Sequence, residues 1–118
     1  MGASFKDLVV WQRAVQLSLA IYKLTSSFPA SEKFGLTNQL RRASVSVASN
    51  IAEGYGSSTK GEYLLFLGHA RGSNCELQTQ LVIADALGLG AEQSRHTAEG
   101  LSNEVSRMLV AMMTKLRQ

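Results

Sequence analysis

The chain contains a single proline, Pro29, and most of its glycines stand between long segments that lack helix-breaking residues. Seven of the ten glycines lie at the N-terminus or at these joints, namely Gly2, Gly35, Gly54, Gly56, Gly61, Gly88 and Gly90. Because proline and glycine interrupt helices more strongly than other residues, the segments between them predict four helices. We place the helices at about residues 7–26, 31–54, 60–87 and 91–116, within one domain spanning residues 1–118.

Apolar residues recur at steps of three and four within each segment, which predicts one buried face per helix. The four stripes are Val10, Ala14, Leu17, Ile21, Leu24 and Phe28; Leu36, Leu40, Ala43 and Val47; Leu67, Ala70, Asn74, Leu77, Leu81 and Ala84; and Leu101, Val105, Met108, Met112 and Leu116, extended by Leu109 and Met113. Capping-box spacing at Ser4–Asp7 and Thr59–Glu62 marks two helix starts. Long helices with short joints favour an all-α, antiparallel up-down-up-down four-helix bundle.

Two local patterns within the helices need interpretation. Residues 41–50, RRASVSVASN, alternate polar and apolar side chains, which is also typical of a strand. A lone strand would have no neighbour to pair with, so we predict helix there. Gly68 and Gly72 lie four residues apart on one face, and such small-residue pairs predict a close crossing with another helix.

Few residues could carry enzymatic chemistry. Cys75, the only cysteine, excludes a disulfide framework within one chain, and its apolar neighbours predict a buried, unreactive thiol. Neither His69 nor His96 belongs to the Glu-x-x-His motif of di-iron bundles, and these residues are too few for a zinc site. No glycine-rich phosphate loop is present. We therefore expect no metal, no cofactor and no enzymatic activity.

One polar cluster on the second and third helices remains. In an antiparallel hairpin around residues 55–59, facing positions add to roughly 116, which places Ser46 opposite Ala70 and Arg41 or Arg42 near Glu76. A cation and a carboxylate at one level most often form a structural ion pair. If the pair is buried, Glu76→Ala should destabilise the fold by roughly 3 kcal/mol. Catalysis by Arg42–Glu76 with Asn50–Glu53 would require a cleft, so an enzyme is the least favoured reading.

Several stretches of the chain resemble a known family. They are FKDLVVWQRA at residues 5–14, FP at 28–29 with Glu32, LTNQLRRASVSVASNIAEGYG at 36–56, and then Lys60, Glu62, Phe66, Leu67, Ala70, Gly72, Ser73, Glu76 and Leu77. With these motifs the chain resembles the bacterial four-helix-bundle proteins associated with 23S rRNA intervening sequences. It is also similar to the accessory protein of diversity-generating retroelements.

The resemblance implies an antiparallel four-helix bundle that assembles as a ring-like homopentamer and is not an enzyme. In the retroelement branch a basic ring engages RNA and a reverse transcriptase, which makes both candidate partners. The positions that match the family signature are Arg42, Ser46, Asn50, Glu53, Gly54, Glu62, Gly72, Ser73 and Glu76. We expect most of them to serve packing or to hold the hairpin.

Charge bears on the choice of partner. Twelve Lys and Arg against nine Asp and Glu give a net charge of +3, which permits a nucleic-acid partner without requiring one. The candidate nucleic-acid-binding residues are Arg41, Arg71, Arg95, Arg107, Lys115 and Arg117. The aromatic residues Trp11, Tyr22, Tyr55 and Tyr63 have apolar neighbours and are predicted to lie in the core or an interface. Binding would therefore be mainly to phosphates and depend strongly on salt.

The sequence thus predicts an oligomer that binds RNA or another nucleic acid through a repeated basic surface. The alternative is a protein-interaction scaffold that binds no nucleic acid, favoured by the wide apolar faces of the first and fourth helices. No segment reaches the roughly 18 apolar residues of a membrane span, and no signal peptide is visible, so we expect no membrane partner and a cytoplasmic location.

Overall fold

A computed structural model describes residues 3–118 of the chain, which form four long helices and no strand. The helices are α1 (Val9–Thr25), α2 (Leu36–Tyr55), α3 (Lys60–Ala86) and α4 (Glu92–Arg117). The single-turn 3-10 helices η1 (Phe5–Asp7) and η2 (Ala30–Glu32) precede α1 and α2. The predicted joint residue Gly2 lies outside the described residues. The all-helical class is confirmed, and so is the helical state of residues 41–50.

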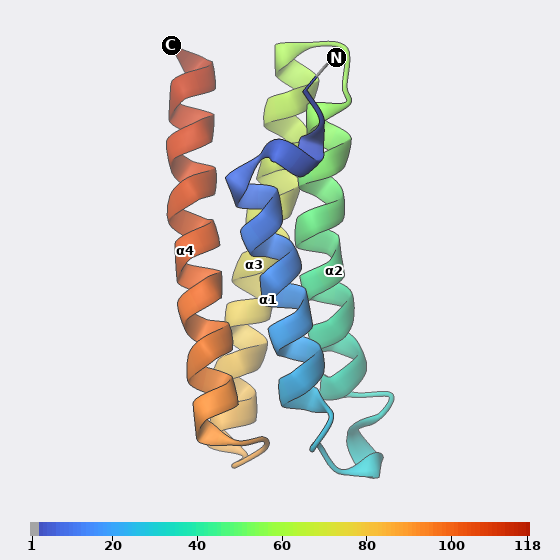
Figure 1. Ribbon diagram of the computed structural model, residues 1–118. Helices are drawn as coiled ribbons and strands as arrows, with labels where there is room; N and C mark the ends of the chain where they lie inside the picture. The colour runs from blue at the N-terminus through green and yellow to red at the C-terminus, as the bar shows by residue number, and fades with distance from the viewer. Residues whose placement is uncertain (1–2) are drawn as a thin grey trace.

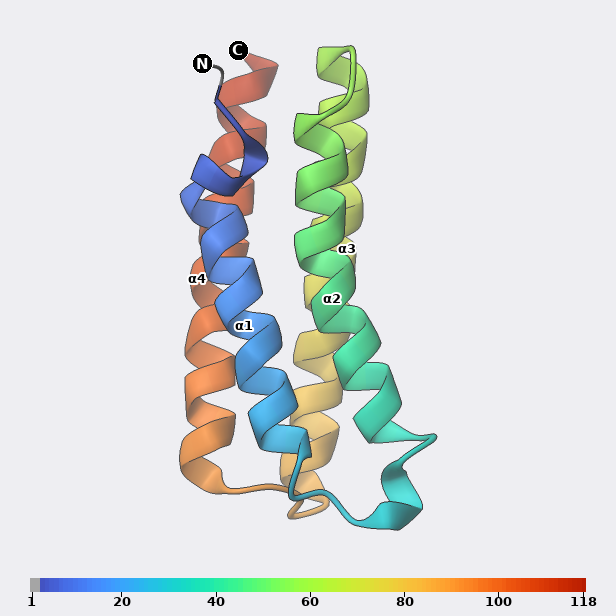
Figure 2. The ribbon, with the colours of Figure 1, turned by 45° about the vertical axis from the view of Figure 1, so that its right-hand side comes forward.

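The four helices lie side by side along a body of 44 × 27 × 23 Å. In Figure 1 the α1–α2 and α3–α4 connections lie at one end, while the α2–α3 connection and the C-terminus lie at the other. Each helix contacts its two neighbours, and the pairs in contact are α1–α2, α2–α3, α3–α4 and α1–α4. Figure 2 shows the α1–α4 pair beside the α2–α3 pair. This arrangement is consistent with a four-helix bundle.

The core confirms most of the predicted stripes and corrects one. All six predicted positions of α1 or its C-terminal extension are buried, as are all six of α3. In α4 the buried residues are Ala98, Ser102, Val105, Leu109 and Met113, whereas Leu101, Met108, Met112 and Leu116 are half-buried. The second set flanks the first because α4 packs against both α1 and α3, so its seam positions are also apolar.

The second helix begins later than predicted. We expected a start near residue 31, but α2 begins at Leu36 and η2 occupies the preceding turn. Gly35 has a non-helical conformation, with φ −107° and ψ −118°. The side chain of Glu32 accepts a hydrogen bond of 3.1 Å from the N–H of Leu36, one of the unpaired donors at the start of α2. Glu32 therefore caps the helix from outside it.

Both predicted capping sequences form caps. Ser4 and Asp7 make a complete capping box, but it caps the N-terminus of η1, and α1 starts only after Leu8. At α3, Thr59 Oγ1 accepts a 3.1 Å hydrogen bond from the N–H of Glu62, as predicted. Local spacing thus identified the capping interactions, whereas the kind of helix that follows depended on the packing of the N-terminal turn.

The register of the α2–α3 hairpin differs from the prediction by three residues. The hydroxyls of Ser46 and Ser73 lie 2.9 Å apart, so Ser46 faces Ser73 rather than Ala70. Farther along, Gln80 Nε2 lies 3.5 Å from Gln39 Oε1. In both pairs the two residue numbers add to 119, whereas the predicted register required a sum of 116. The connection itself, residues 56–59, lies where the sequence predicted it, so the three-residue difference arises in how the two helices pack.

The glycines of α3 do not make the predicted close crossing. A Cβ on Gly72 would find nothing within 4 Å, and one on Gly68 would meet only Met113 Cε at 4.0 Å. The close approach lies instead at Gly54 on α2, where a Cβ would stand 3.0 Å from Tyr63 Cδ1. Gly54 thus allows α2 and α3 to approach, whereas Gly72 lies on an open surface of the chain.

Candidate nucleic-acid interface

Arg41 extends from α2 across the groove between α1 and α2. Its Nε donates a hydrogen bond of 2.8 Å to Thr25 Oγ1, and its Cζ lies 4.5 Å from the centroid of the Tyr22 ring. The Thr25 hydroxyl in turn donates to the carbonyl of Ile21 at 2.7 Å. Stacking on an aromatic ring holds a guanidinium flat. Its Nη groups form no ion pair among residues 3–118, so they remain available to an anion.

A hollow of about 530 Å³ adjoins this arginine. We call it the arginine hollow, and it is lined by Tyr22, Asn38, Arg41, Arg42, Val45 and Ser46. The side chain of Arg42 is exposed and has no ion-pair partner among the described residues. Tyr22 and Val45 are also exposed. The hollow therefore combines two guanidinium groups with apolar surface and lacks a carboxylate.

The net positive charge of the chain arises from the stretch of sequence that supplies this hollow. Residues 20–52 contain four cations, Lys23, Lys33, Arg41 and Arg42, and one acid, Glu32. The carboxylate of Glu32 is engaged as the cap of α2. The rest of the chain carries eight cations and eight acids, so the net charge of +3 arises entirely from residues 20–52. A local excess of one sign attracts a polyanion more effectively than the same charge spread over the surface.

An exposed aromatic residue lies in the α1–α2 connection. Phe34 is 85% exposed, and the Nζ of Lys33 lies 5.5 Å from its ring centroid. No role was predicted from the sequence for Phe34, Lys33 or Lys23. The available signal was the position of Phe34, which stands outside every apolar stripe and next to a cation. An exposed ring beside positive charge is a typical surface for stacking a nucleobase.

The other predicted nucleic-acid-binding residues are dispersed. Arg95 is only 11% exposed at its side chain and pairs with Asp85 at 3.0 Å. Arg71 is exposed on α3, whereas Arg107 and Arg117 are exposed on α4. Lys115 lines a separate hollow with Lys60, Tyr63, Met112, Leu116 and Gln118, toward the end opposite the α1–α2 connection. Of the six candidates, the arginine hollow includes only Arg41.

The predicted ion pair between Arg41 or Arg42 and Glu76 does not form. Both Arg42 and Glu76 are exposed, and neither has an ionic partner among residues 3–118. The register is not the cause, because the numbers of Arg42 and Glu76 add to 118, close to the observed sum of 119; instead, both helices are rotated so that these side chains are exposed. Both charged side chains therefore lie on outer faces of their helices, and the condition for a large effect of Glu76→Ala is not met.

The remaining signature residues have mixed roles. The Nδ2 of Asn50 donates to the Ser46 carbonyl at 2.9 Å and approaches the Ser46 hydroxyl at 3.0 Å, which extends the Ser46–Ser73 contact along the α2–α3 seam. Gly54 allows the close approach of α2 and α3, and the N–H of Glu62 donates to the cap at Thr59. Glu53 is exposed and takes part in no side-chain hydrogen bond within the described residues. Ser46, Asn50 and Ser73 therefore hold the two helices in register.

The prediction that Cys75 is a buried thiol is wrong, because the residue is exposed. Its neighbour Asn74 faces the core, and one helical residue turns the next side chain by about 100°. Asn74 Nδ2 donates to the carbonyl of Ser102 at 2.9 Å, and the Ser102 hydroxyl donates to Asn74 Oδ1 at 2.7 Å. This buried polar pair joins α3 to α4, and no local sequence signal points to Ser102 as the partner.

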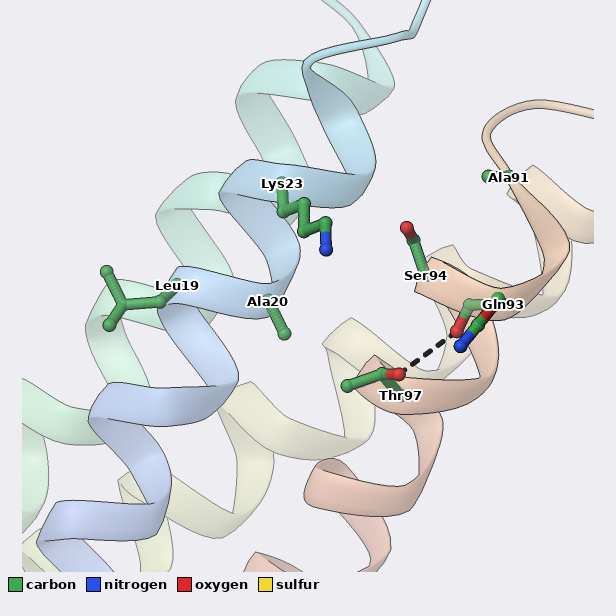
Figure 3. A pocket seen from close by; sticks show the side chains of 7 residues that line it. All are labelled: Leu19, Ala20, Lys23, Ala91, Gln93, Ser94 and Thr97. Carbon is green, nitrogen blue, oxygen red and sulfur yellow. Dashed lines mark hydrogen bonds between the residues drawn. The ribbon is translucent and has the colours of Figure 1, made fainter.

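A second cleft, of about 460 Å³, lies between α1 and the start of α4. Its lining residues are Leu19, Ala20, Lys23, Ala91, Gln93, Ser94 and Thr97. Figure 3 shows Lys23 extending toward the α4 side of this cleft, while Thr97 Oγ1 donates to the Gln93 carbonyl at 3.1 Å. The lining contains one titratable group, Lys23, and no acid–base pair. The cleft therefore contains one cation and offers no catalytic arrangement.

Two further properties hold for the part of the chain that the structure describes. No group of three or more His, Cys, Asp or Glu side chains is placed to hold a metal ion. Within residues 3–118, no helix is both long enough and apolar enough to cross a membrane.

Comparisons with known proteins place this geometry in a family context. The model of the family described as 23S rRNA-intervening sequence protein matches residues 6–111. Among solved structures, the chain is similar to a protein of unknown function from the S23 ribosomal protein family of Bacteroides thetaiotaomicron. That match has 18% identity and a TM-score of 0.79, and it covers 89% of this chain and 98% of the other. At this identity the likeness shows the fold alone. A comparison with curated proteins finds no match.

Proposed function

The chain belongs to the 23S rRNA-intervening sequence protein family, and from that premise we propose that it is a non-enzymatic protein that binds RNA at the arginine hollow. The observation that carries the proposal is the location of the net charge. All of the +3 arises from residues 20–52, the stretch that supplies every residue of the arginine hollow. The RNA backbone supplies the complementary negative charge at regular spacing.

The residues of the hollow suit different parts of a polynucleotide. Arg41 and Arg42 would contact phosphates, since guanidinium groups bind phosphate oxygens through paired N–H donors. Tyr22 in the hollow and Phe34 in the α1–α2 connection would stack against unpaired bases, which favours loops and single-stranded segments over regular duplex. Phosphate contacts carry little sequence information. We therefore infer weak sequence preference and a strong dependence of affinity on salt.

We propose further that the helices run antiparallel in up-down-up-down order and that copies assemble into the ring-like homopentamer implied by the family resemblance. A ring would present the basic α1–α2 side five times. Several weak sites on one assembly bind a long RNA more tightly than one site does, because later contacts become intramolecular. A reverse transcriptase remains a candidate protein partner on the same resemblance.

A scaffold that binds another protein and no nucleic acid is the second candidate. The observation that favours it is the outer face of α3, which exposes Leu65, Val82 and Ile83. Exposed apolar residues grouped on one face are typical of protein contacts. Capture of a protein partner that survives nuclease treatment, together with no RNA binding at low salt, would favour the scaffold.

Arg42→Gln provides the direct test of RNA binding. The measurement is the affinity for a structured RNA with single-stranded loops, by fluorescence anisotropy across a salt series. Loss of one phosphate contact should weaken binding several-fold and reduce the slope of log K against log salt by about 0.7–0.9. Arg107→Gln removes another exposed arginine, on α4, and should leave both values unchanged. Equal losses in the two variants, or a slope near zero for the unmodified protein, would contradict the proposal.

A further inference from the structure

The helix α3 has a second apolar face, directed away from the core. We call it the outer stripe, and its members are Leu65, Gly68, Gly72, Cys75, Thr79 and Val82. They follow steps of three and four, the spacing of a coiled-coil seam. Leu65 is 55% exposed and Val82 is 67% exposed. Within this chain, nothing lies within 4 Å of the position that a Cβ of Gly72 would occupy.

Covering the outer stripe would leave no polar side chain of the stripe buried without a hydrogen-bond partner. None of its six members is charged, so no ion would lose its hydration. The only hydroxyl, on Thr79, already donates to the carbonyl of Cys75 at 3.0 Å. Gly68 and Gly72 present no side chain, which permits a second helix to approach the backbone closely. The stripe therefore has the properties of a helix-packing surface, and within this chain only Met113 Cε, 4.0 Å from the position of a Cβ on Gly68, comes near its two glycines.

Charged residues on either side of the outer stripe indicate what covers it. Arg71 and Glu76 are both exposed, flank the stripe on opposite sides and have no ionic partner among the described residues. In heptad terms they occupy a g position and the following e position, five residues apart. In a parallel pair of helices, a g residue of one helix lies beside that e residue of the other. Two copies of α3 would thus form two reciprocal Arg71–Glu76 pairs.

We propose that the outer stripe packs in parallel against the same stripe of a second copy of this chain. Like positions then meet, with Leu65 on Leu65 and Val82 on Val82 at the ends and the glycines between them. The contact accounts for two signature residues that have no packing role within one chain, since Gly72 permits the approach and Glu76 pairs across it. The inference does not rest on RNA binding.

A contact between identical surfaces closes at two copies. It is therefore a different interface from the head-to-tail contacts that build a ring of five. Where both form, the α3 contact joins subunits of different rings. Light scattering at micromolar concentration separates the cases: we expect a mass of about twice the 12.8 kDa chain where the α3 contact forms alone, and twice the mass of the ring where both contacts form. A monomer, or a ring that does not pair, at all accessible concentrations would overturn the inference.

Cysteine cross-linking tests the contact residue by residue. In the parallel arrangement Cys75 meets Cys75 of the second copy, so a copper–phenanthroline oxidant should join them, the two thiols losing two protons and two electrons to it. Leu65→Cys in a Cys75→Ser background should cross-link equally well. In an antiparallel pair, two copies of residue 65 would lie about 25 Å apart and would not react. Thr114→Cys in the same background, an exposed position on α4, measures random collision.

The orientation has an independent test in charge exchange. Glu76→Arg places like charges together and should raise the dimer dissociation constant roughly tenfold, while Arg71→Glu combined with Glu76→Arg should restore it. RNA affinity measured on the same variants keeps this result separate from the proposed function. Cross-linking of residue 65 no faster than residue 114, or no recovery in the exchanged variant, would overturn the parallel contact.

Discussion

Arg41 on α2 is tied to Thr25 on α1 by a hydrogen bond of 2.8 Å from Nε to Oγ1. Thr25 is buried, so its hydroxyl is a fixed acceptor rather than a mobile surface group. The bond has two consequences. It links the last turn of α1 to α2, and it holds the arginine against Tyr22 with its Nη groups free. Stability and the proposed RNA binding therefore depend on the same contact.

Thr25→Val should affect both properties. Valine keeps the shape of threonine but removes the acceptor, so the Nε of Arg41 loses its hydrogen-bond partner. A hydrogen bond involving a charged group contributes about 1.5–3 kcal/mol, and we expect a loss of stability toward the lower end because Arg41 is half-buried. Denaturant unfolding measures this loss, and anisotropy should show weaker RNA binding. Thr114→Val on α4 is the matched control and should change neither. If Thr25→Val changes neither the free energy of unfolding nor the RNA affinity, the bond is not maintained in solution.

Gly54→Ala and Gly72→Ala should differ in sign. At Gly54 the added Cβ would stand 3.0 Å from Tyr63 Cδ1, and overpacking of this kind costs about 1–3 kcal/mol. At Gly72 the added Cβ meets nothing, so the gain in helix propensity should stabilise the monomer by up to about 1 kcal/mol. Thermal unfolding at low concentration compares them. Gly72→Ala should also slow cross-linking at Cys75, since it separates the two α3 helices; equal destabilisation of both variants would contradict the assignment.

Glu76→Ala should leave the monomer unchanged within about 0.5 kcal/mol, because its carboxylate is exposed and has no partner in the described chain. Denaturant unfolding well below the dimer dissociation constant is the appropriate measurement. At higher concentration the same variant should lose stability relative to the unmodified protein, since it lacks the pair across the α3 contact. A loss of roughly 3 kcal/mol at low concentration would restore the idea of a buried pair within one chain.

Alkaline pH should destabilise the fold through Tyr63. Burial raises the pKa of Tyr63 above its ordinary value of 10.0, and the neighbouring phenol of Tyr55 raises it further. The folded chain thus holds this proton more tightly than the unfolded chain does. The associated stability is fully present below pH 10 and declines as the pH rises through the folded-state pKa. Unfolding measured across this range should show a smaller decline in Tyr63→Phe; an identical decline would exclude Tyr63 as its source.

Much of the fold was predictable because the relevant signals are local. The faces of α1 and α3 follow from side-chain periodicity, and the cap of α3 from two residues three apart. The candidate interface was predictable only in part. Arg41 stood among the nucleic-acid-binding candidates, but Arg42 was assigned to a structural cluster, and Phe34 had no assigned role. Which of six basic residues share a surface depends on helix rotation and register, which local periodicity does not specify.

Four helices and the core faces of α1 and α3 follow from local sequence alone, because glycine and proline positions and a period of 3.6 residues act within one segment. The register of 119 at Ser46–Ser73 and the separation of Arg42 from Glu76 appear only in the folded chain. Each of these depends on how one helix is rotated and shifted against another. That placement results from the whole set of core contacts, so no single segment contains the information.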